Sequence, residues 1–394
     1  MKVVFFSNYL NHHQLSFCEA LVRLTDNSFR FVAQKAISEK RIAFGYQNIT
    51  EKYPFVVKTY KSKEELQEAY KLAEDAQYVL FGSSNNDYLK NRLKNNQLTI
   101  KYSERLFKKK LNLFESIKGY RRVYINHTKY KNKNLYMLCA SAYAAYDFNR
   151  FGAYKNKTYK WGYFPGTKYY DVDDLIKSKE VNKKIKILWA GRLIDWKHPE
   201  CCIEIARRLK EDNVDFVMNI IGNGLLEDEL KLKIDEYNLN GYVNMLGSMT
   251  PDEVRKHMEE SNIFMFTSNM QEGWGAVLNE AMNSACACVA SHAIGSAGFL
   301  IKNNVNGSIY KDGDIEDLYF RVKSLIDDNK KRNDICKNAY KTISELWNSE
   351  VAASRFLTLC ECLAKGEDTP FVDGPCSKAI SISDSEMYDY LMSN

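Results

Sequence analysis

The residues from Gln271 to Ala290 read QEGWGAVLNEAMNSACACVA, and this stretch decides how the surrounding chain folds. An apolar run at 263–267 leads into it, and a second apolar run at 286–290 closes it. Between the two runs, Gly273 and Gly275 mark a turn that is followed by apolar residues at helical spacing. A strand, a glycine turn, a helix and a strand in this order predict one unit of a parallel α/β sheet.

Two carboxylates, Glu272 and Glu280, flank the beginning of this predicted helix. A helix N-terminus presents unpaired N–H groups and a partial positive charge, so it favours an anion such as a diphosphate. Carboxylates accept hydrogen bonds from hydroxyls, so the pair suits a ribose on one side and a sugar on the other. The alternative is that the pair arises by chance, because strand, glycine turn and helix recur in every doubly wound domain.

Two cations follow another apolar run, which extends from Ile185 to Gly191. Arg192 offers a planar fork to a phosphate, and Lys197, five residues later, offers a mobile point charge. In an open α/β sheet, ligands bind beyond the carboxyl ends of the strands, where these cations are expected. The alternative is that both are solvated surface residues, which is the usual place of Arg and Lys.

Together these residues resemble the motifs of a known enzyme family. Glu272 and Glu280 match the E-x7-E signature of retaining glycosyltransferases with the GT-B fold, family 4 in particular. Arg192 and Lys197 match the G-R-x4-K pattern of the same family. The resemblance implies an α/β fold of the GT-B type, in which two Rossmann-like doubly wound domains face a central cleft.

The resemblance also implies a role for each matching residue. Arg192 and Lys197 would bind the donor diphosphate and stabilise it as it leaves, Glu280 would bind the ribose, and Glu272 would hold the sugar. The turn would present its backbone to the diphosphate and the sugar, through Gly273, Trp274 and Gly275. The family implies transfer with retention and with no metal ion or other cofactor.

Two further apolar runs end in glycine turns and add donor-binding candidates. The turns read Gly222-Asn223-Gly224 and Gly247-Ser248-Met249. In the family they face the nucleotide, and backbone near the second turn contacts the base. Gly191, Asn223, Ser248 and Met249 are therefore predicted to line the donor site. For each turn alone, the alternative is a plain connecting glycine.

The N-terminal half also predicts a parallel sheet, because apolar runs alternate with helical patterns. These runs lie at Val3–Phe6, Phe29–Ala33, Phe55–Val57, Tyr78–Gly82 and Leu98–Tyr102. We expect an acceptor-binding domain over 1–168, joined by C-terminal helices from 350–394. A donor-binding domain is expected over 180–349.

The N-terminal half departs from the family at two places. Its first loop lacks the usual glycines and carries His12 and His13, which either contact phosphate or acceptor or serve in capping and packing. Where the family often has a sugar-contacting His, this chain has Glu104, which either contacts the sugar or pairs with Arg105. His127 is a third candidate for the site, and its alternative is a structural role.

The segment from Lys101 to Lys133 contains eleven Lys or Arg against two Glu. Phe107, Leu111, Phe114 and Ile117 lie within it at helical spacing. Such a helix can bind an anionic membrane surface and bring a lipid-linked acceptor within reach. The alternative is a charged helix that packs on the domain through its apolar stripe. Nucleic acid is not an expected partner, because no RNA-binding signature is present and the pI is near 8.6.

Length and composition fit an ordinary globular protein of two domains, with 394 residues, 45% hydrophobic and 27% charged. No apolar run reaches membrane-spanning length, and Met1–Phe6 is too short for a signal peptide. Ten cysteines show no zinc-ligand spacing, which favours buried thiols in the reducing cytoplasm. Peripheral attachment to the inner membrane face is the expectation if the basic segment binds a membrane. Asp171 and Asp173 resemble a D-x-D metal motif, but they lie in a linker and are not assigned to a metal.

The sequence therefore predicts a retaining, metal-independent glycosyltransferase. It would move a sugar from a nucleotide-diphosphate sugar to a saccharide or lipid-linked acceptor, in surface polysaccharide or lipid-linked oligosaccharide synthesis. Two alternatives stay open: a non-catalytic nucleotide-sugar-binding partner subunit, and a nucleotide-sugar epimerase or hydrolase of the same fold.

Overall fold

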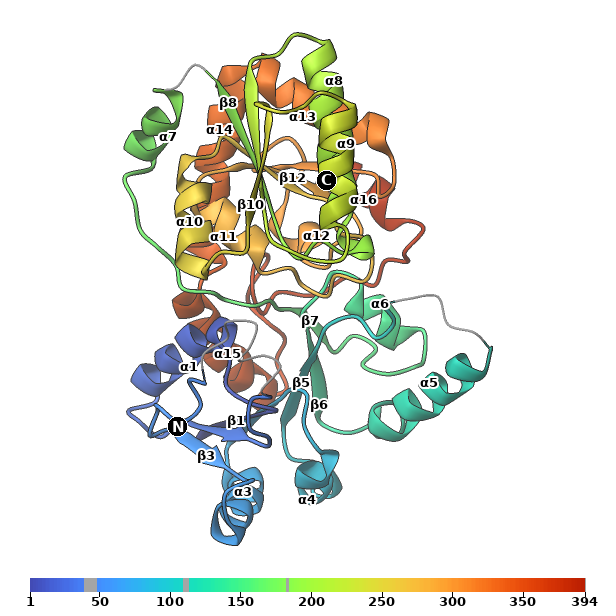
Figure 1. The fold of residues 1–394 in the computed structure, drawn as a ribbon. Coiled ribbons are helices and arrows are strands. Elements are labelled where there is room, and N and C mark those ends of the chain that lie inside the picture. Colours follow the sequence, from blue (N-terminus) through green and yellow to red (C-terminus); the bar gives the residue numbers. More distant parts are fainter. Residues whose placement is uncertain (39–47, 109–112, 182–183, 394) are drawn as a thin grey trace. The chain divides into compact units, whose positions relative to one another are not determined.

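The computed structural model describes residues 1–38, 48–108, 113–181 and 184–393. The chain forms two compact units (Figure 1). Unit 1 comprises Met1–Gly166 and Trp347–Ile382, and unit 2 comprises Thr167–Leu346 and Ser383–Asn394. The chain leaves unit 1 after Gly166, two residues before the end of the domain predicted over 1–168.

The C-terminal end of the chain differs from the prediction. Residues 347–382 belong to unit 1 as expected, but the chain from Ser383 onward belongs to unit 2. There the hydroxyl of Tyr388 donates a hydrogen bond to the Asp317 carboxylate at 2.8 Å. This pairing between residues 71 positions apart has no signal in the sequence.

Unit 1 contains a seven-stranded, all-parallel sheet with the strand order β3-β2-β1-β4-β5-β6-β7. Its strands are β1 (Val3–Ser7), β2 (Arg30–Ala33), β3 (Val56–Lys58), β4 (Tyr78–Phe81), β5 (Thr99–Ser103), β6 (Leu135–Cys139) and β7 (Thr158–Lys160). The five predicted strands are confirmed, and β6 and β7 were not predicted. β7 is a short edge strand of three residues, which gives hydrophobic periodicity too little length to detect.

The main helices of unit 1 are α1 (His12–Leu24), α3 (Lys63–Asp75), α4 (Lys90–Lys94), α5 (Leu113–Asn126), α6 (Ala144–Asn149) and α15 (Ser349–Ala364). Although α15 comes late in the sequence, it packs against α1. Phe17 of α1 lies 6.1 Å from Phe356 of α15 and 5.1 Å from Trp161, ring centre to ring centre. This aromatic cluster is why the C-terminal helix belongs to the first unit.

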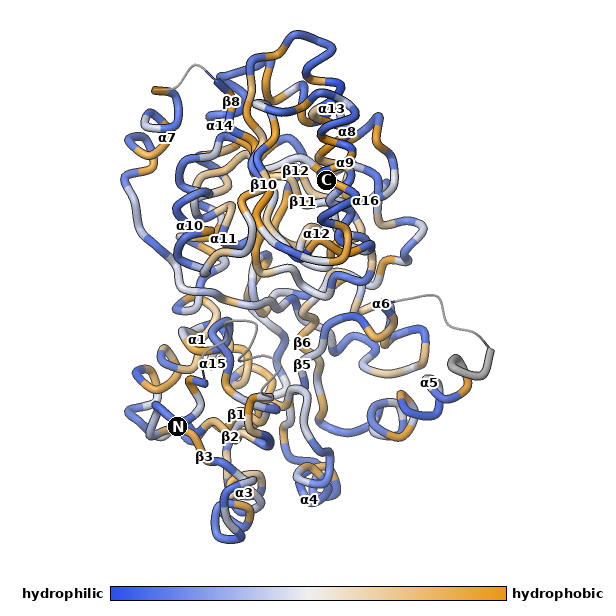
Figure 2. The backbone as a smooth tube through the Cα atoms, in the orientation of Figure 1, coloured by the Kyte–Doolittle hydropathy of each residue, from blue (hydrophilic) through white to orange (hydrophobic). Residues whose placement is uncertain are grey.

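Unit 2 contains a six-stranded, all-parallel sheet with the strand order β10-β9-β8-β11-β12-β13. Its strands are β8 (Ile185–Ala190), β9 (Phe216–Ile221), β10 (Val243–Gly247), β11 (Ile263–Phe266), β12 (Ala287–Ser291) and β13 (Ser308–Tyr310). β11 and β12 are buried along their whole length, and Figure 2 shows the apolar residues concentrated in this sheet. Such continuous burial is typical of a parallel sheet with helices on both faces.

Helices cover both faces of the second sheet (Figure 1). One layer contains α7 (Val172–Glu180), α10 (Pro251–Glu260), α11 (Val277–Asn283) and α14 (Asn329–Lys341). The other contains α8 (Glu200–Glu211), α9 (Glu227–Glu236) and α13 (Ile315–Asp327), and the short helices are α12 (Ala297–Leu300) and α16 (Met387–Ser393). Both units are therefore Rossmann-like, as predicted.

Two helices of unit 2 begin at side chains that cap them. Thr250 and Glu253 form a capping box at the start of α10. Asp171 caps α7 by accepting hydrogen bonds from the backbone N–H groups of Asp173 and Asp174, both at 3.1 Å. The D-x-D pair is therefore part of a helix start.

In both sheets the strand order reverses between two neighbouring strands. The reversal lies between β1 and β4 in unit 1 and between β8 and β11 in unit 2. In open parallel sheets this point creates a crevice at the carboxyl edge, and ligands bind there. The loops after these four strands are therefore the first places to look for a site.

All ten cysteines are free thiols, and eight of them are buried. Over the part of the chain that the structure describes, no helix combines the length and apolar character needed to cross a bilayer.

Candidate functional site

The residues of the two main motifs meet at the reversal point of unit 2. Lys197 lies in the loop after β8, and Glu272 lies in the loop after β11, the neighbouring strand. The Lys197 ammonium forms an ion pair with the Glu272 carboxylate, and both side chains are only 13% exposed. The ammonium also lies 4.6 Å from the ring centre of Trp196. A half-enclosed cation of this kind is suited to an anionic ligand.

The backbone of Lys197 is fixed by a residue that the sequence did not single out. The Thr267 hydroxyl donates a hydrogen bond to the Lys197 carbonyl at 2.7 Å and accepts one from the indole N–H of Trp189 at 2.9 Å. In addition, the backbone N–H of Asn269 donates to the Trp196 carbonyl at 3.0 Å. The loop after β11 thus holds the loop after β8 in place.

We expect the substitution Thr267→Val to lower transfer about tenfold, because it releases the Lys197 backbone and leaves two buried polar groups unpaired. The measurement is kcat and KM for the donor together with the melting temperature. Thr267→Ser keeps the hydroxyl and should restore activity. A Val variant with normal kinetics would remove the positioning role.

Arg192 lies at the surface, directly after β8. Its guanidinium carbon is 5.5 Å from the ring centre of Trp196. Across the described residues, no carboxylate forms an ion pair with it, so its donors are available to a ligand. Trp196 therefore contacts both cations of the motif.

Glu280 lies in the first turn of α11 and is half-buried. Within the described parts of the chain, no donor is bonded to its carboxylate, although Arg255 acts on it electrostatically. Burial raises the pKa of Glu280 to about 7, and the positive charge of Arg255 opposes that rise. A half-buried carboxylate without a donor is able to accept hydrogen bonds from hydroxyls of a ligand.

The Gly-Trp-Gly turn is held by its tryptophan. The Trp274 side chain is buried, and its indole N–H donates to the Asn279 side-chain oxygen at 2.8 Å. At Gly275, φ is +82°, and an added Cβ would lie 2.6 Å from the ring of Phe266. The Trp274 side chain is therefore a structural anchor of the turn, and backbone contacts of Gly273 and Gly275 to a ligand stay a prediction.

The loops after β8, β9 and β10 are locked together at their glycines. The Gly222 N–H donates to the Gly247 carbonyl at 2.7 Å, and the Leu193 N–H donates to the Asn223 carbonyl at 2.9 Å. Ser248 is exposed, and Met249 is half-buried in the last of these loops. Gly191, Asn223, Ser248 and Met249 thus lie in loops at the same edge of the sheet, and their contacts to a donor stay predictions.

His12 and His13 open α1, and their ring centres lie 3.8 Å apart. His12 is exposed, whereas the His13 ring stacks on Tyr163 at 5.9 Å. Burial, reinforced by His12, lowers the pKa of His13 to about 3, so its ring is neutral. The surroundings of His13 favour packing, and the surroundings of His12 are compatible with a contact to a ligand.

Among the described contacts, Glu104 pairs with Lys108 rather than with Arg105. Its carboxylate forms an ion pair with Lys108 and accepts a hydrogen bond from the Tyr163 hydroxyl at 2.6 Å. Arg105 is buried and turns instead to Asp147 at 3.9 Å. The pairing of neighbours fails here because Asp147 is fully buried and requires a cation.

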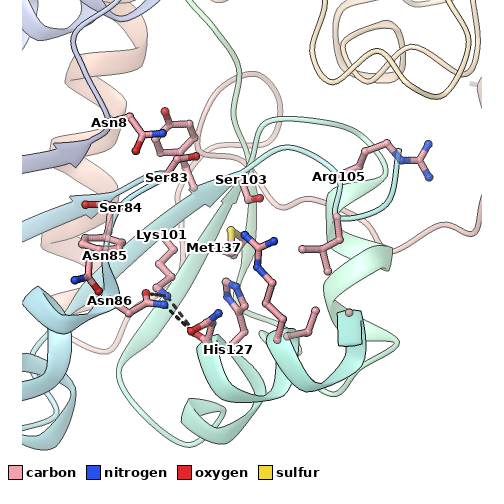
Figure 3. A pocket seen from close by; sticks show the side chains of 18 of the residues that line it. Asn8, Ser83, Ser84, Asn85, Asn86, Lys101, Ser103, Arg105, His127 and Met137 are labelled. Atoms are coloured by element: carbon pink, nitrogen blue, oxygen red, sulfur yellow. Dashed lines mark hydrogen bonds between the residues drawn. The ribbon is translucent and has the colours of Figure 1, made fainter. Parts of the chain in front are cut away.

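His127 lines a cavity of about 890 Å³ in unit 1 (Figure 3). Its Nδ1 lies 2.7 Å from the Tyr154 hydroxyl. Burial is the main cause that lowers the pKa of His127 well below its usual value, and the nearby charges of Lys101 and Arg122 add to it. His127 is therefore a neutral residue of a positively charged cavity.

Sequence reasoning missed His198 and Lys101. The His198 ring joins the Glu200 carboxylate at 2.7 Å to the Asn269 side chain at 3.1 Å, which ties α8 to the loop after β11. Its signal was a histidine directly after the G-R-x4-K pattern. Lys101 is a lysine inside a buried strand, which is itself an unusual feature.

Residues 171–342 match the family model described as glycosyl transferases group 1. The amylovoran biosynthesis glycosyltransferase AmsK of Erwinia amylovora is 32% identical over 143 residues, which is 35% of each chain. An N-acetylgalactosaminyltransferase of Campylobacter jejuni, named for a diphospho-undecaprenol-linked acceptor, is 31% identical over 156 residues, or 40% of this chain and 41% of that protein. The chain thus matches about two fifths of the length of these curated relatives.

The crystal structure of HepE from Anabaena in complex with UDP is similar across both units. It has a TM-score of 0.67 at 16% identity and covers 93% of this chain and 100% of that one. The likeness shows the fold, which is GT-B. The group 1 match over most of unit 2, together with this fold, supports a glycosyltransferase.

Proposed function

We propose that the protein transfers a sugar from a nucleotide-diphosphate sugar to an acceptor hydroxyl with retention of configuration. The observation that carries the proposal is the grouping of Arg192, Lys197 and Glu272 at the reversal point of the second sheet. Lys197, after β8, pairs with Glu272, after β11, and Glu280 lies in the first turn of α11, the helix that follows the Gly-Trp-Gly turn. This is an anion site next to two groups that accept hydrogen bonds from hydroxyls.

The chemistry follows from where charge develops. As the bond between sugar and diphosphate breaks, negative charge grows on the departing phosphate. Arg192 and Lys197 would stabilise that charge, so the mechanism requires no metal ion. The acceptor hydroxyl would attack from the face that the phosphate leaves, and the departing phosphate would take its proton. Glu272 would hold Lys197 and the sugar in the reactive geometry.

The comparisons support a polysaccharide or lipid-linked product. AmsK is named for amylovoran biosynthesis, and the Campylobacter relative for a lipid-diphosphate acceptor. HepE has been crystallised with UDP and with UDP-glucose. We therefore propose a UDP-sugar donor and an acceptor from surface polysaccharide or lipid-linked oligosaccharide assembly. The ten free thiols fit a reducing compartment such as the cytoplasm.

The experiment is incubation of the full chain with UDP-, GDP-, dTDP- and ADP-sugars in the absence of acceptor, followed by NMR. Slow hydrolysis of one donor that is lost in Glu272→Ala would support the proposal and name the sugar. If no donor reacts, the transferase assignment fails, and a donor that binds without reacting would favour the non-catalytic nucleotide-sugar-binding alternative.

Donor binding should weaken as the pH falls below 7, because the hydroxyls of the ribose bond to the ionised form of Glu280. With a pKa of about 7, the Kd of the donor should rise about tenfold from pH 8 to pH 6. Calorimetric titration at several pH values measures this. Glu280→Gln should bind more weakly at pH 8 and lose this pH dependence; an identical profile in the variant would contradict the role.

A further inference from the structure

The cavity of unit 1 lies at the carboxyl edge of the seven-stranded sheet, where the strand order reverses between β1 and β4. Its walls come from the loops after β1, β2 and β4, from β5 and β6, and from α5. Its volume of about 890 Å³ is large enough for a sugar with a diphosphate. Its position and size are those of a ligand site.

The charge of the cavity has one sign. Among the described residues that line it there are five cations and no carboxylate: Lys35, Lys101, Arg105, Lys118 and Arg122. Arg105 is matched by Asp147, but Lys35, Lys101 and Arg122 form no ion pair with a described carboxylate. Sugar hydroxyls need acceptors as well as donors, whereas a phosphate only accepts hydrogen bonds. The lining therefore suits an anion better than a neutral sugar.

Lys101 is the decisive residue, because it is only 4% exposed. Its ammonium donates to the Asn86 side-chain oxygen at 2.6 Å and to the Asn126 carbonyl at 3.1 Å (Figure 3). Both acceptors are neutral, so they satisfy two of its three N–H groups without balancing its charge. A buried cation without a counter-charge is costly to the folded chain. A bound anion would remove that cost.

The pKa of Lys101 is consistent with a buried ammonium that lacks a counter-charge. Burial, together with the charge of Lys129, lowers the pKa of Lys101 to about 7. An anion next to the ammonium would restore the proton, because an opposite charge favours the charged form.

We propose that this cavity binds a phosphate or diphosphate group of the acceptor, with Lys101 as its buried contact and Arg122 as its exposed contact. That the anion belongs to an acceptor rests on the glycosyltransferase function proposed above. Ser83, Ser84 and Asn85 in the loop after β4 would add hydrogen-bond donors to the same group.

The outer side of α5 points to a lipid as the source of the phosphate. Four large apolar side chains of this helix are 42–60% exposed: Ile117, Tyr120, Tyr124 and Ile125. Arg121 lies among them, and Lys118 and Arg122 of the same helix line the cavity. One helix thus combines exposed apolar residues with cations for a head group, as interfacial helices do.

This arrangement corrects the helix that the sequence predicted in the basic segment. Phe107 precedes the helix and packs on Phe151 at 5.8 Å, and Ile117 is exposed rather than packed. Leu111 and the side chain of Phe114 lie outside the described residues. Among the side chains of α5 that the structure describes, Val123 is a buried apolar residue.

The test uses inorganic pyrophosphate and calorimetry on the full chain carrying Arg192→Met and Lys197→Met. These two substitutions remove the two cations of the proposed donor site in unit 2, so that the remaining binding reports on unit 1. We expect one site that weakens at least tenfold in Lys101→Met and about threefold to tenfold in Arg122→Gln. Arg121→Gln is the matched control on the same helix, since Arg121 is exposed and does not line the cavity.

The absence of binding, or binding that survives both Lys101→Met and Arg122→Gln, would overturn the proposal. If Lys101→Met does not fold by circular dichroism, the exposed Arg122 decides alone. Donor hydrolysis is measured separately on the chain with Arg192 and Lys197 intact, because it depends on the other unit. Hydrolysis there, alongside failed pyrophosphate binding, would reject the anion site and leave the transferase function standing. Absence of hydrolysis with intact pyrophosphate binding would reject the transferase function and leave the anion site standing.

A flotation assay separates the two sources of the phosphate. Lipid-borne phosphate predicts that the chain floats with phosphatidylglycerol vesicles but not with phosphatidylcholine vesicles. It also predicts that Ile117→Ser with Tyr124→Ser abolishes flotation while pyrophosphate binding persists. Pyrophosphate binding without flotation would assign the site to a water-soluble phosphorylated acceptor. It would also exclude a membrane-binding role for α5.

Discussion

Lys197→Ala is expected to lower sugar transfer by about a hundredfold to a thousandfold. The substitution removes a positive charge from the place where the departing phosphate becomes negative, which is the kind of contact that counts most in the transition state. It also leaves Glu272, only 13% exposed, without its ion-pair partner. Initial rates of transfer, with kcat and KM for the donor, measure the effect, and circular dichroism checks the fold.

Lys186→Ala is the matched control, because Lys186 lies near the start of β8, the strand that precedes the motif, and pairs there with Glu260. It should leave transfer within about twofold of the unsubstituted chain, since surface ion pairs contribute little. Glu272→Ala should fall as far as Lys197→Ala, and the double variant should lose little more, because the two residues act as one unit. Normal turnover in Lys197→Ala or Glu272→Ala would remove the catalytic assignment.

Gly222→Ala is expected to prevent the folding of unit 2 or to destabilise it by about 3–5 kcal/mol. A Cβ at this position would lie 1.8 Å from the Gly191 carbonyl oxygen, and φ is +139°, a region that side chains disfavour. The backbone carbonyl cannot move away without displacing the loop that carries Arg192 and Lys197. The donor site should therefore be lost along with stability. Thermal unfolding and donor binding measure both effects.

Gly241→Ala tests whether the close contact or the positive φ causes the loss. Gly241 also has a positive φ, of +86°, but a Cβ there would meet no atom within 4 Å. We expect a cost of only about 1 kcal/mol and unchanged donor binding. Equal destabilisation by the two substitutions would show that the backbone angle, and not the approach of two loops, explains the glycine at 222.

The sequence alone identified the residues of the proposed donor site and most of the strands that position them. Glu272, Glu280, Arg192 and Lys197 each follow an apolar run, and parallel strands bring the ends of such runs to one edge. Local pattern was sufficient here because each strand, turn and helix start involves residues that are close together in the sequence, as the Thr250 capping box shows.

Only the tertiary structure decided which side chains meet. The partner of Glu104 is Lys108 instead of the adjacent Arg105, because the fully buried Asp147 takes that arginine. Thr267 bonds to the Lys197 carbonyl although it lies 70 residues away in the sequence. The Trp189 indole holds Thr267 in turn. The buried ammonium of Lys101 is visible only once β5, α5 and the loop after β4 enclose it. The physical reason is that burial and the pairing of charges depend on atoms from distant parts of the chain, whereas strands and turns depend on neighbours.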